Sequence, residues 1–358
     1  MEEIKLPLCK SPIKVYSNYA YVLSVLLNKE EAFSWFYSNF IQVKYIRETK
    51  DHHRFIFNYS LGNLTKYFYN EPFLQVRTLS RDFLIKNCGD VIEFLCNALK
   101  EGYYVVTVVD NYYLFSKEEY KKLHNLHLIM LHGFNRQNHC FYSMGFDRDI
   151  YRESQISFDS FRQAVTSLEG DNIHVRDDYC MMYKLQDESL LAYPQENFNY
   201  FPYRFNRNLV KRSLQEYLES VCTDEHFSAF YEVPSSGEYG ISYYEAMLEY
   251  VQKFLDGTYN GNLYMVSFHG MMEHKQVMVQ RLKYMQEKQY IKNADSVTED
   301  YKKLADEAAV IRNLAIKYNI SMKKELLEKI SRLLEEMYIT EKDVVMQLIE
   351  LLDLEVLS

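Results

Sequence analysis

The stretch from residue 103 to 147 constrains the fold most, because three strand-like runs follow one another closely there. The runs cover 103–110, 127–132 and 140–146. The first run is almost wholly apolar, which is typical of a strand buried at the centre of a sheet. Neighbouring antiparallel strands joined by a short turn bring the start of one beside the end of the next. We therefore expect His127 and Asp147 to meet at one sheet edge, where a carboxylate could orient an imidazole base.

Composition excludes several classes of protein. The chain has 358 residues, of which 47% are hydrophobic, enough for a sizeable core. No apolar run approaches the ~20 residues of a membrane span, and the first residues lack the features of a secretion signal. We expect a cytoplasmic protein with no membrane partner. The net charge of −9 argues against a nucleic-acid partner. Six cysteines without CxxC spacing predict buried thiols, and neither a metal site nor a cofactor is expected.

The pattern of apolar residues divides the chain into two domains. An α+β domain is expected over 1–190, beginning with an irregular arm at 1–14, and a helical domain over 208–358. Residues 191–207 are rich in Asn, Pro, Tyr and Phe and are interpreted as a linker. The last helical stretch is expected to break near 318–321 and 338–340, with Ser321 and Thr340 as N-caps. The preceding helical stretch carries His269, Glu273 and His274. His269 and Glu273 are four residues apart and can share a helix face, and a solvated face is favoured there over a second catalytic site.

A first helix is predicted to open at Ser17, with Ser17 or Asn18 as its N-cap. A helix start suits a nucleophile, because its free N–H groups and positive dipole end stabilise a thiolate and later an oxyanion. The backbone N–H of Asn18 would be an oxyanion donor. His127 opens a strand and is the candidate general base, while a histidine satisfied by a carbonyl is the plain alternative.

Three residues of the same stretch are candidate substrate-binding groups. Asp110 ends the buried strand, and it is either a strand-end cap or a residue on the amine-binding side of a pocket. Tyr112 follows it closely. His124 is three residues before His127, and this HxxH pattern has no third ligand at metal spacing, so zinc is not expected.

Several of these motifs together resemble the butirosin acyltransferase family. The resemblance covers roughly 15–290 and rests on the segments VVDNYY, HNLHLIMLHGFN, FYSMGFD, ISFDSFRQAV, YGISYYEAMLEYV and FHGMMEHKQVMVQRL. It implies a papain-like fold related to the bacteriocin-leader peptidases, with a Cys–His–Asp site and a helical C-terminal region. Some relatives join carrier-bound acyl chains to an amine, as in closthioamide assembly, and the layout of this sequence is similar.

The sequence departs from this family at the nucleophile. The family implies a cysteine at the start of the first helix, and the matching position is Ser17. A natural serine, a loss of activity, and a Cys→Ser replacement made to trap a complex all fit, and we favour the replacement. Cys9 is the only other cysteine nearby, but it lies in a Pro-flanked arm.

The resemblance implies an amide-forming acyltransferase of natural-product assembly. Its acyl donor would be a thioester on the phosphopantetheine of a carrier protein, and its acceptor a small amine. Ser17, His127 and Asp147 would be its catalytic residues. The C-terminal helices are candidates for a dimer face or a carrier-docking site. A cysteine peptidase of the same fold and a catalytically inactive binding protein remain the alternatives.

Overall fold

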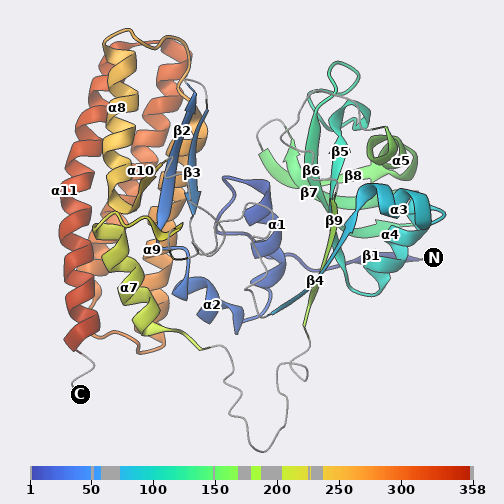
Figure 1. The fold of residues 1–358 in the computed structure, drawn as a ribbon, viewed down its shortest axis with the longest axis horizontal. Helices are drawn as coiled ribbons and strands as arrows, with labels where there is room; N and C mark the ends of the chain where they lie inside the picture. Colours follow the sequence, from blue (N-terminus) through green and yellow to red (C-terminus); the bar gives the residue numbers. More distant parts are fainter. Residues whose placement is uncertain are drawn as a thin grey trace, which may run out of the picture. The chain divides into compact units, whose positions relative to one another are not determined.

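The computed structural model describes residues 2–49, 52–57, 73–147, 150–167, 179–186, 204–224, 226 and 237–354. It is an α+β structure that divides into two compact units (Figure 1). Unit 1 comprises 1–32 and 68–202, and unit 2 comprises 33–67 and 203–358. The sequence-based division therefore misplaces 33–67, which belong with the C-terminal helices. Residues 191–203 of the expected linker lie outside the described residues.

Within the described residues, unit 1 is built on a seven-stranded sheet whose strands all pair antiparallel. The strand order is β4-β9-β5-β6-β7-β8, and β1 pairs with β6. The strands are β1 (Glu3–Lys5), β4 (Leu74–Ser80), β5 (Tyr104–Asp110), β6 (Leu126–Asn135), β7 (Cys140–Asp147), β8 (Ile150–Ser157) and β9 (Tyr179–Leu185). The helices are α1 (Ser17–Leu26), α3 (Arg81–Asn87), α4 (Val91–Lys100), the 3₁₀ turn η1 (Asn111–Tyr113) and α5 (Phe158–Thr166).

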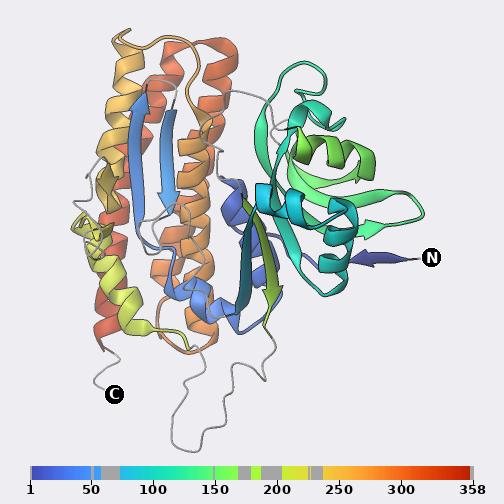
Figure 2. The ribbon, with the colours of Figure 1, turned by 45° about the vertical axis from the view of Figure 1, so that its right-hand side comes forward.

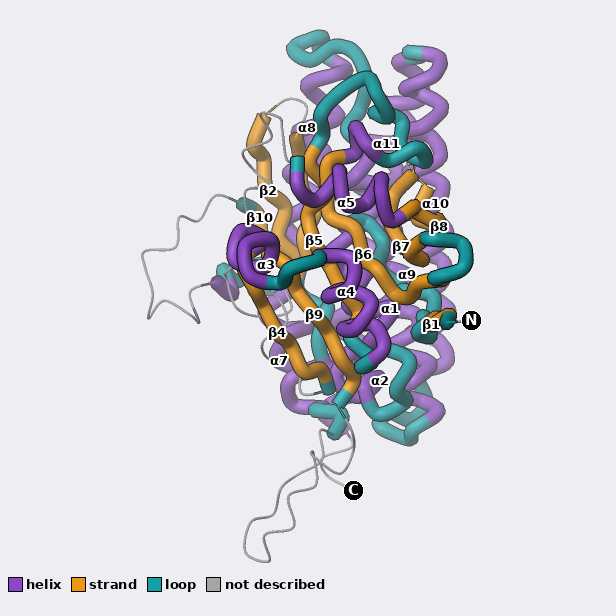
Figure 3. The backbone as a smooth tube through the Cα atoms, turned by 90° about the vertical axis from the view of Figure 1, so that its right-hand side faces the viewer, coloured by secondary structure: helices purple, strands orange, loops and turns teal. Residues whose placement is uncertain are grey.

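Helices cover both faces of this sheet. Helix α1 lies on one face, and α3, α4 and α5 lie on the other (Figures 1 and 3). The core beneath α4 and α5 is formed by apolar side chains of the helices and of the central strands, including Leu95, Leu99, Phe161, Val165, Val105, Val109, Ile129 and Leu131. Because side chains alternate along a strand, Val106, Val108 and Asp110 belong to the opposite face, which α1 covers.

Strand β1 corrects the expectation of an irregular arm at 1–14. Its three residues pair with the end of β6, with Ile4 opposite Phe134 and Lys5 opposite Gly133. Gly133 permits this close approach, because a Cβ there would lie only 2.3 Å from the Ile4 carbonyl oxygen. The pairing partner is about 130 residues away in the chain, so local sequence gave no indication of this strand.

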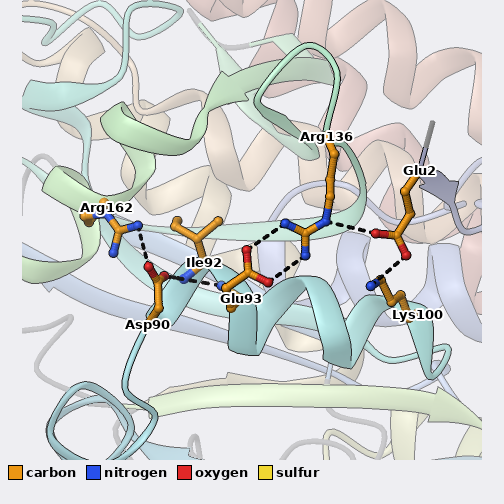
Figure 4. A network of polar contacts seen from close by, with 7 residues as sticks. All are labelled: Glu2, Asp90, Ile92, Glu93, Lys100, Arg136 and Arg162. Carbon is orange, nitrogen blue, oxygen red and sulfur yellow. Dashed lines mark hydrogen bonds and ion pairs between the residues drawn. The ribbon is translucent and has the colours of Figure 1, made fainter.

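Asp90 is the N-cap of α4 and joins it to α5. Its Oδ1 accepts hydrogen bonds from the amides of Ile92 (2.8 Å) and Glu93 (3.3 Å), and Arg162 binds its Oδ2 at 3.0 Å (Figure 4). An exposed chain of ion pairs runs from Glu93 of the same helix through Arg136 and Glu2, which lie outside it, to Lys100 at its end. Exposed pairs of this kind contribute little to stability, so the cap is the larger contribution.

We expect Asp90→Ala to lower the free energy of unfolding by about 1 kcal/mol, because two amides at the start of α4 lose their acceptor. Urea denaturation measures this change. Asp90→Asn is the matched control, since asparagine caps a helix equally well but cannot pair with Arg162. If Asn is as destabilising as Ala, the ion pair and not the cap stabilises the helix start.

Unit 2 combines a small sheet with a bundle of long helices (Figure 2). Strand β2 pairs antiparallel with both β3 and β10, and β3 packs on α9. Gly270 of α9 allows this contact, because a Cβ there would lie 2.9 Å from the Phe55 ring of β3. The elements of this unit are α2 (Ala32–Ser38), β2 (Val43–Thr49), β3 (His52–Phe57), α7 (Arg207–Leu218), β10 (Glu238–Tyr239), the 3₁₀ turn η4 (Gly240–Ser242), α8 (Tyr243–Leu255), α9 (Met265–Glu287), α10 (Asp295–Ser321) and α11 (Lys324–Leu354).

The C-terminal helices differ from expectation at one of two breaks. The first break is present, because α10 ends at Ser321 and Met322 adopts a left-handed conformation with φ 56°. The second is absent, because α11 runs unbroken through 338–340. Ser321 and Thr340 are not N-caps as expected, because Ser321 Oγ and Thr340 Oγ1 each donate a hydrogen bond to a carbonyl one helical turn earlier. No described helix is both long and apolar enough to cross a bilayer.

Helix α9 buries polar groups that the sequence suggested were solvated. His269 Nε2 lies 3.2 Å from Glu273 Oε1, and the Glu273 side chain is only 4% exposed. His274 is also buried, with Nε2 2.7 Å from the Ile41 carbonyl. The next residue, Lys275, is fully buried and binds both carboxylate oxygens of Glu341 on α11 at 2.5 and 2.6 Å. Glu273 of the expected solvated face is therefore buried in unit 2, whereas His269 stays 32% exposed.

Candidate functional site

The site predicted from the sequence begins at the amino end of α1. Ser17 is the first residue of this helix, and Tyr16 is its N-cap without a side-chain hydrogen bond. Neither Ser17 nor Asn18 therefore caps the helix as predicted. The first amides of an α-helix have no intrahelical acceptor, so the N–H groups of Ser17 and Asn18 are available to an oxyanion. The Ser17 side chain is half-buried.

Tyr21 attaches α1 to the central strand that carries the candidate base. Its hydroxyl donates to the Leu128 carbonyl oxygen at 2.8 Å, two residues after the start of β6. Ser17 is four residues before Tyr21, so it lies on the same side of the helix, one turn nearer the amino end.

Contacts at the other end of α1 fix its direction along the sheet. The Ser24 carbonyl accepts from the Cys9 amide at 2.9 Å. Two residues before Cys9, the Pro7 carbonyl accepts from the Tyr104 hydroxyl at 2.5 Å, at the start of β5. The carboxyl half of α1 thus lies toward the start of β5. Its amino end, with Ser17, points toward the sheet edge where β5 ends and β6 begins.

At this edge the strands β6 and β7 separate, and two side chains form hydrogen bonds with the carbonyl groups that the ladder leaves unpaired. The register between the strands ends at Met130 opposite Met144. Beyond that pair, Tyr21 binds the Leu128 carbonyl, and the Lys117 ammonium donates to the Phe146 carbonyl. Lys117 is only 7% exposed. Burial lowers the pKa of its ammonium group, and the charge of nearby Asp147 opposes that shift.

His127 lies at this opening between the strands. Its Nδ1 is 3.0 Å from the Leu128 carbonyl, the oxygen that Tyr21 also binds. A carbonyl only accepts hydrogen bonds, so Nδ1 carries the proton and Nε2 carries the lone pair. Burial lowers the pKa of His127, the hydrogen bond to the Leu128 carbonyl opposes this shift, and the charge of Lys117 adds to it. In register, His127 is opposite Val109, on the face of the sheet that α4 and α5 cover.

Asp147 does not hold the His127 ring as predicted. It forms an ion pair with Arg152 of the neighbouring strand, and among the described residues its buried Oδ1 has no hydrogen-bond partner. The prediction is wrong because the ladder ends before these positions, and Tyr21 and Lys117 occupy the opening. The Leu128 carbonyl, and not a carboxylate, orients the His127 ring. Among the described residues, no hydrogen bond joins Ser17 to His127.

The carboxylate–histidine pair expected at this edge is formed by Asp110 and His124. His124 Nδ1 lies 2.6 Å from Asp110 Oδ2, and the Asp110 side chain is fully buried while that of His124 is 31% exposed. The other oxygen, Oδ1, accepts from the amides of Tyr112 (3.0 Å) and Asn125 (3.2 Å). The Tyr112 ring stacks on His124, with centroids 4.1 Å apart. All three predicted substrate-binding residues therefore lie together.

Cys9 lacks the properties of a reactive thiol. Burial raises the pKa of its thiol group, whereas a nucleophilic cysteine needs a lowered pKa. Its Sγ lies 3.4 Å from the Leu23 carbonyl, where only a protonated thiol can donate. Within the described ranges, no group of three or more His, Cys, Asp or Glu side chains has the arrangement of a metal site.

The sequence did not single out Tyr21 or Lys117 as parts of the site. Tyr21 follows the apolar spacing of a core helix, and Lys117 begins the polar run KEEYKK, which resembles an exposed loop. Their positions depend on the opening between β6 and β7, which is a tertiary feature. No protein-family model matches this chain, and a search of curated proteins finds no match either.

Proposed function

We propose that this protein is an amide-forming acyltransferase with a papain-like arrangement of helix α1 against the antiparallel sheet. One observation carries the proposal. The amino end of α1 points to the sheet edge where two imidazoles, His127 and His124, each hold a proton on Nδ1 and direct the lone pair to Nε2. Acyl transfer needs a nucleophile and an imidazole base, and a helix start that points to an edge bearing imidazoles supplies both parts.

In the proposed reaction, a thiolate at position 17 attacks the carbonyl carbon of a thioester on a carrier protein. The carbonyl oxygen becomes an oxyanion, which the Asn18 N–H stabilises. The carbon–sulfur bond to the carrier breaks, and the carrier leaves as a thiol with the proton that His127 took from the thiol at position 17. An amine then attacks the acyl-enzyme and loses a proton, and the thiolate at position 17 is released. The products are an amide and free enzyme.

His127 is the proposed general base of the first half-reaction. Its register position is on the face opposite α1, so its ring must act through the opening between β6 and β7. Tyr21 of α1 supports this, because it binds in that opening the same Leu128 carbonyl that orients His127. Asp147 has no part in this proton path, since it pairs with Arg152. A serine at position 17 reacts poorly here, because its hydroxyl must lose a proton during the attack.

We expect Ser17→Cys to form an acyl-enzyme when incubated with an acyl thioester of a phosphopantetheine-loaded carrier. Intact-protein mass spectrometry would show the mass of the acyl group added to the chain, and an added amine would remove that mass as the amide. Ser17→Ala is the control and should stay unmodified. If Ser17→Cys yields only free acid at every amine concentration, the transferase proposal fails. Cleavage of a fluorogenic peptide panel would then support a peptidase.

A further inference from the structure

The sheet edge carries two imidazoles, His127 and His124, whereas a single general base needs only one. His127 is oriented by a neutral carbonyl, whereas His124 is held by the fully buried carboxylate of Asp110. The two rings therefore differ in their partners and in their positions: one is oriented by a backbone carbonyl within β6, and the other by a side chain at the end of β5.

The register places Asp110 on the face that bears α1. Asp110 is opposite Leu126, whereas the preceding pair, Val109 and His127, belongs to the face beneath α4 and α5. Successive residues of a strand alternate between faces, so Asp110 lies on the face over which the Ser17 end of α1 extends. An acyl group carried at position 17 would thus lie on the same side of the sheet as the Asp110–His124 pair.

We propose that Asp110 and His124 form the acceptor subsite, which binds a primary amine and takes its proton during amide formation. This inference rests on the proposed function. The negative charge of Asp110 attracts the cationic amine, and the Tyr112 ring stacked on His124 forms a flat wall beside it. The bound ammonium first releases one proton to solvent, so that the neutral amine attacks. The new carbon–nitrogen bond then forms, the carbon–sulfur bond at position 17 breaks to release the thiolate, and the second amine proton passes to His124 Nε2. The part of His124 that is exposed then returns this proton to solvent.

The two half-reactions separate this role from that of His127. In the Ser17→Cys background, we expect His124→Gln to form the acyl-enzyme at a rate within about threefold of its parent, while amide formation falls about 10²–10⁴-fold, the range for loss of one acid–base group. Hydrolysed acid should replace the amide as product. Asp110→Asn should shift the products in the same direction, because it keeps the shape of the side chain and removes its charge. His139→Gln is the matched control, since His139 is exposed in the turn between β6 and β7 and should change neither step.

Three results would overturn the inference. The first is an equal loss of acylation and amide formation in His124→Gln, and the second is unchanged amide formation in the same variant. The third is a loss of both steps in the His139→Gln control. A second measurement does not depend on acylation. The ¹⁵N resonances of His124 in the unaltered chain should shift on titration with n-propylamine, and Asp110→Asn should abolish the shift. A shift without any acylation of Ser17→Cys would refute only the transferase proposal, and an unchanged resonance would refute the subsite.

Discussion

His127→Ala in the Ser17→Cys background should slow formation of the acyl-enzyme about 10²–10⁴-fold, the usual contribution of a general base. The variant keeps the nucleophile and the helix start but loses the ring whose Nε2 accepts the proton. The rate is measured in single turnovers by quenched-flow mass spectrometry at saturating thioester. His132→Gln is the matched control, because His132 is buried on the same strand at its other end, with Nδ1 3.3 Å from the Leu6 carbonyl.

The pH dependence of the same reaction gives a second test of His127. Burial lowers the pKa of its ring below the ordinary value of about 6.5. Because only the neutral ring accepts a proton, the acylation rate should stay level as the pH falls through 6.5 and should decline only in more acid solution. The variant without His127 should lack this decline. A decline centred at or above 6.5, or one that survives in His127→Ala, would show that another group is the base.

Lys275→Met should lower the free energy of unfolding of unit 2 by about 3–5 kcal/mol, the cost of leaving one partner of a buried ion pair alone. Lys275 and Glu341 are both fully buried, and Tyr244 also donates to the Glu341 carboxylate at 2.8 Å. Burial lowers the pKa of Lys275, and Glu341 opposes that shift. The methionine has a similar volume, so the loss reflects the uncompensated charge of Glu341 rather than a cavity. Urea unfolding followed by circular dichroism measures it.

Two further variants identify the cause of that loss. In the double variant Lys275→Met/Glu341→Gln, the remaining amide still accepts from Tyr244 but carries no charge, so it should be more stable than Lys275→Met alone. Lys302→Met removes an exposed lysine that pairs with Glu299 at 3.4 Å, and it should change stability by no more than about 0.5 kcal/mol. If the double variant is the least stable of the three, hydrogen bonds and not charge hold this cluster together.

Elements with strong local patterns were predictable from the sequence, and elements made by distant pairing were not. The amphipathic spacing over Tyr243–Leu255 predicts α8 at its observed bounds, and the apolar run at 103–110 predicts β5 to within one residue. Strand β1 escaped prediction because its partner is far along the chain. The break expected at 338–340 is absent because packing of α11 against α8 and α10 outweighs weak local propensity.

The candidate site was predictable as a location but not as a set of contacts. Helix direction points Ser17 toward the sheet edge where β6 begins, but the register places His127 of β6 on the opposite face, so their meeting stays a prediction. The prediction that Asp147 is the carboxylate partner was wrong. The β6–β7 ladder stops before Asp147, and side chains of other elements, Tyr21 and Lys117, bind the carbonyl groups beyond that point. Asp110 and His124 form the pair instead, since the polar turn after β5 folds back on the strand end.

Unit 2 draws β2 and β3 from residues 33–67, whereas the helices they contact, α8 and α9, come after residue 203. During translation the ribosome therefore releases this hairpin long before its covering helices have been made. The ring of Phe55, which is fully buried against Gly270 in the finished protein, has no cover during that interval. Nascent chains in that interval depend on chaperones more than a chain with contiguous domains would.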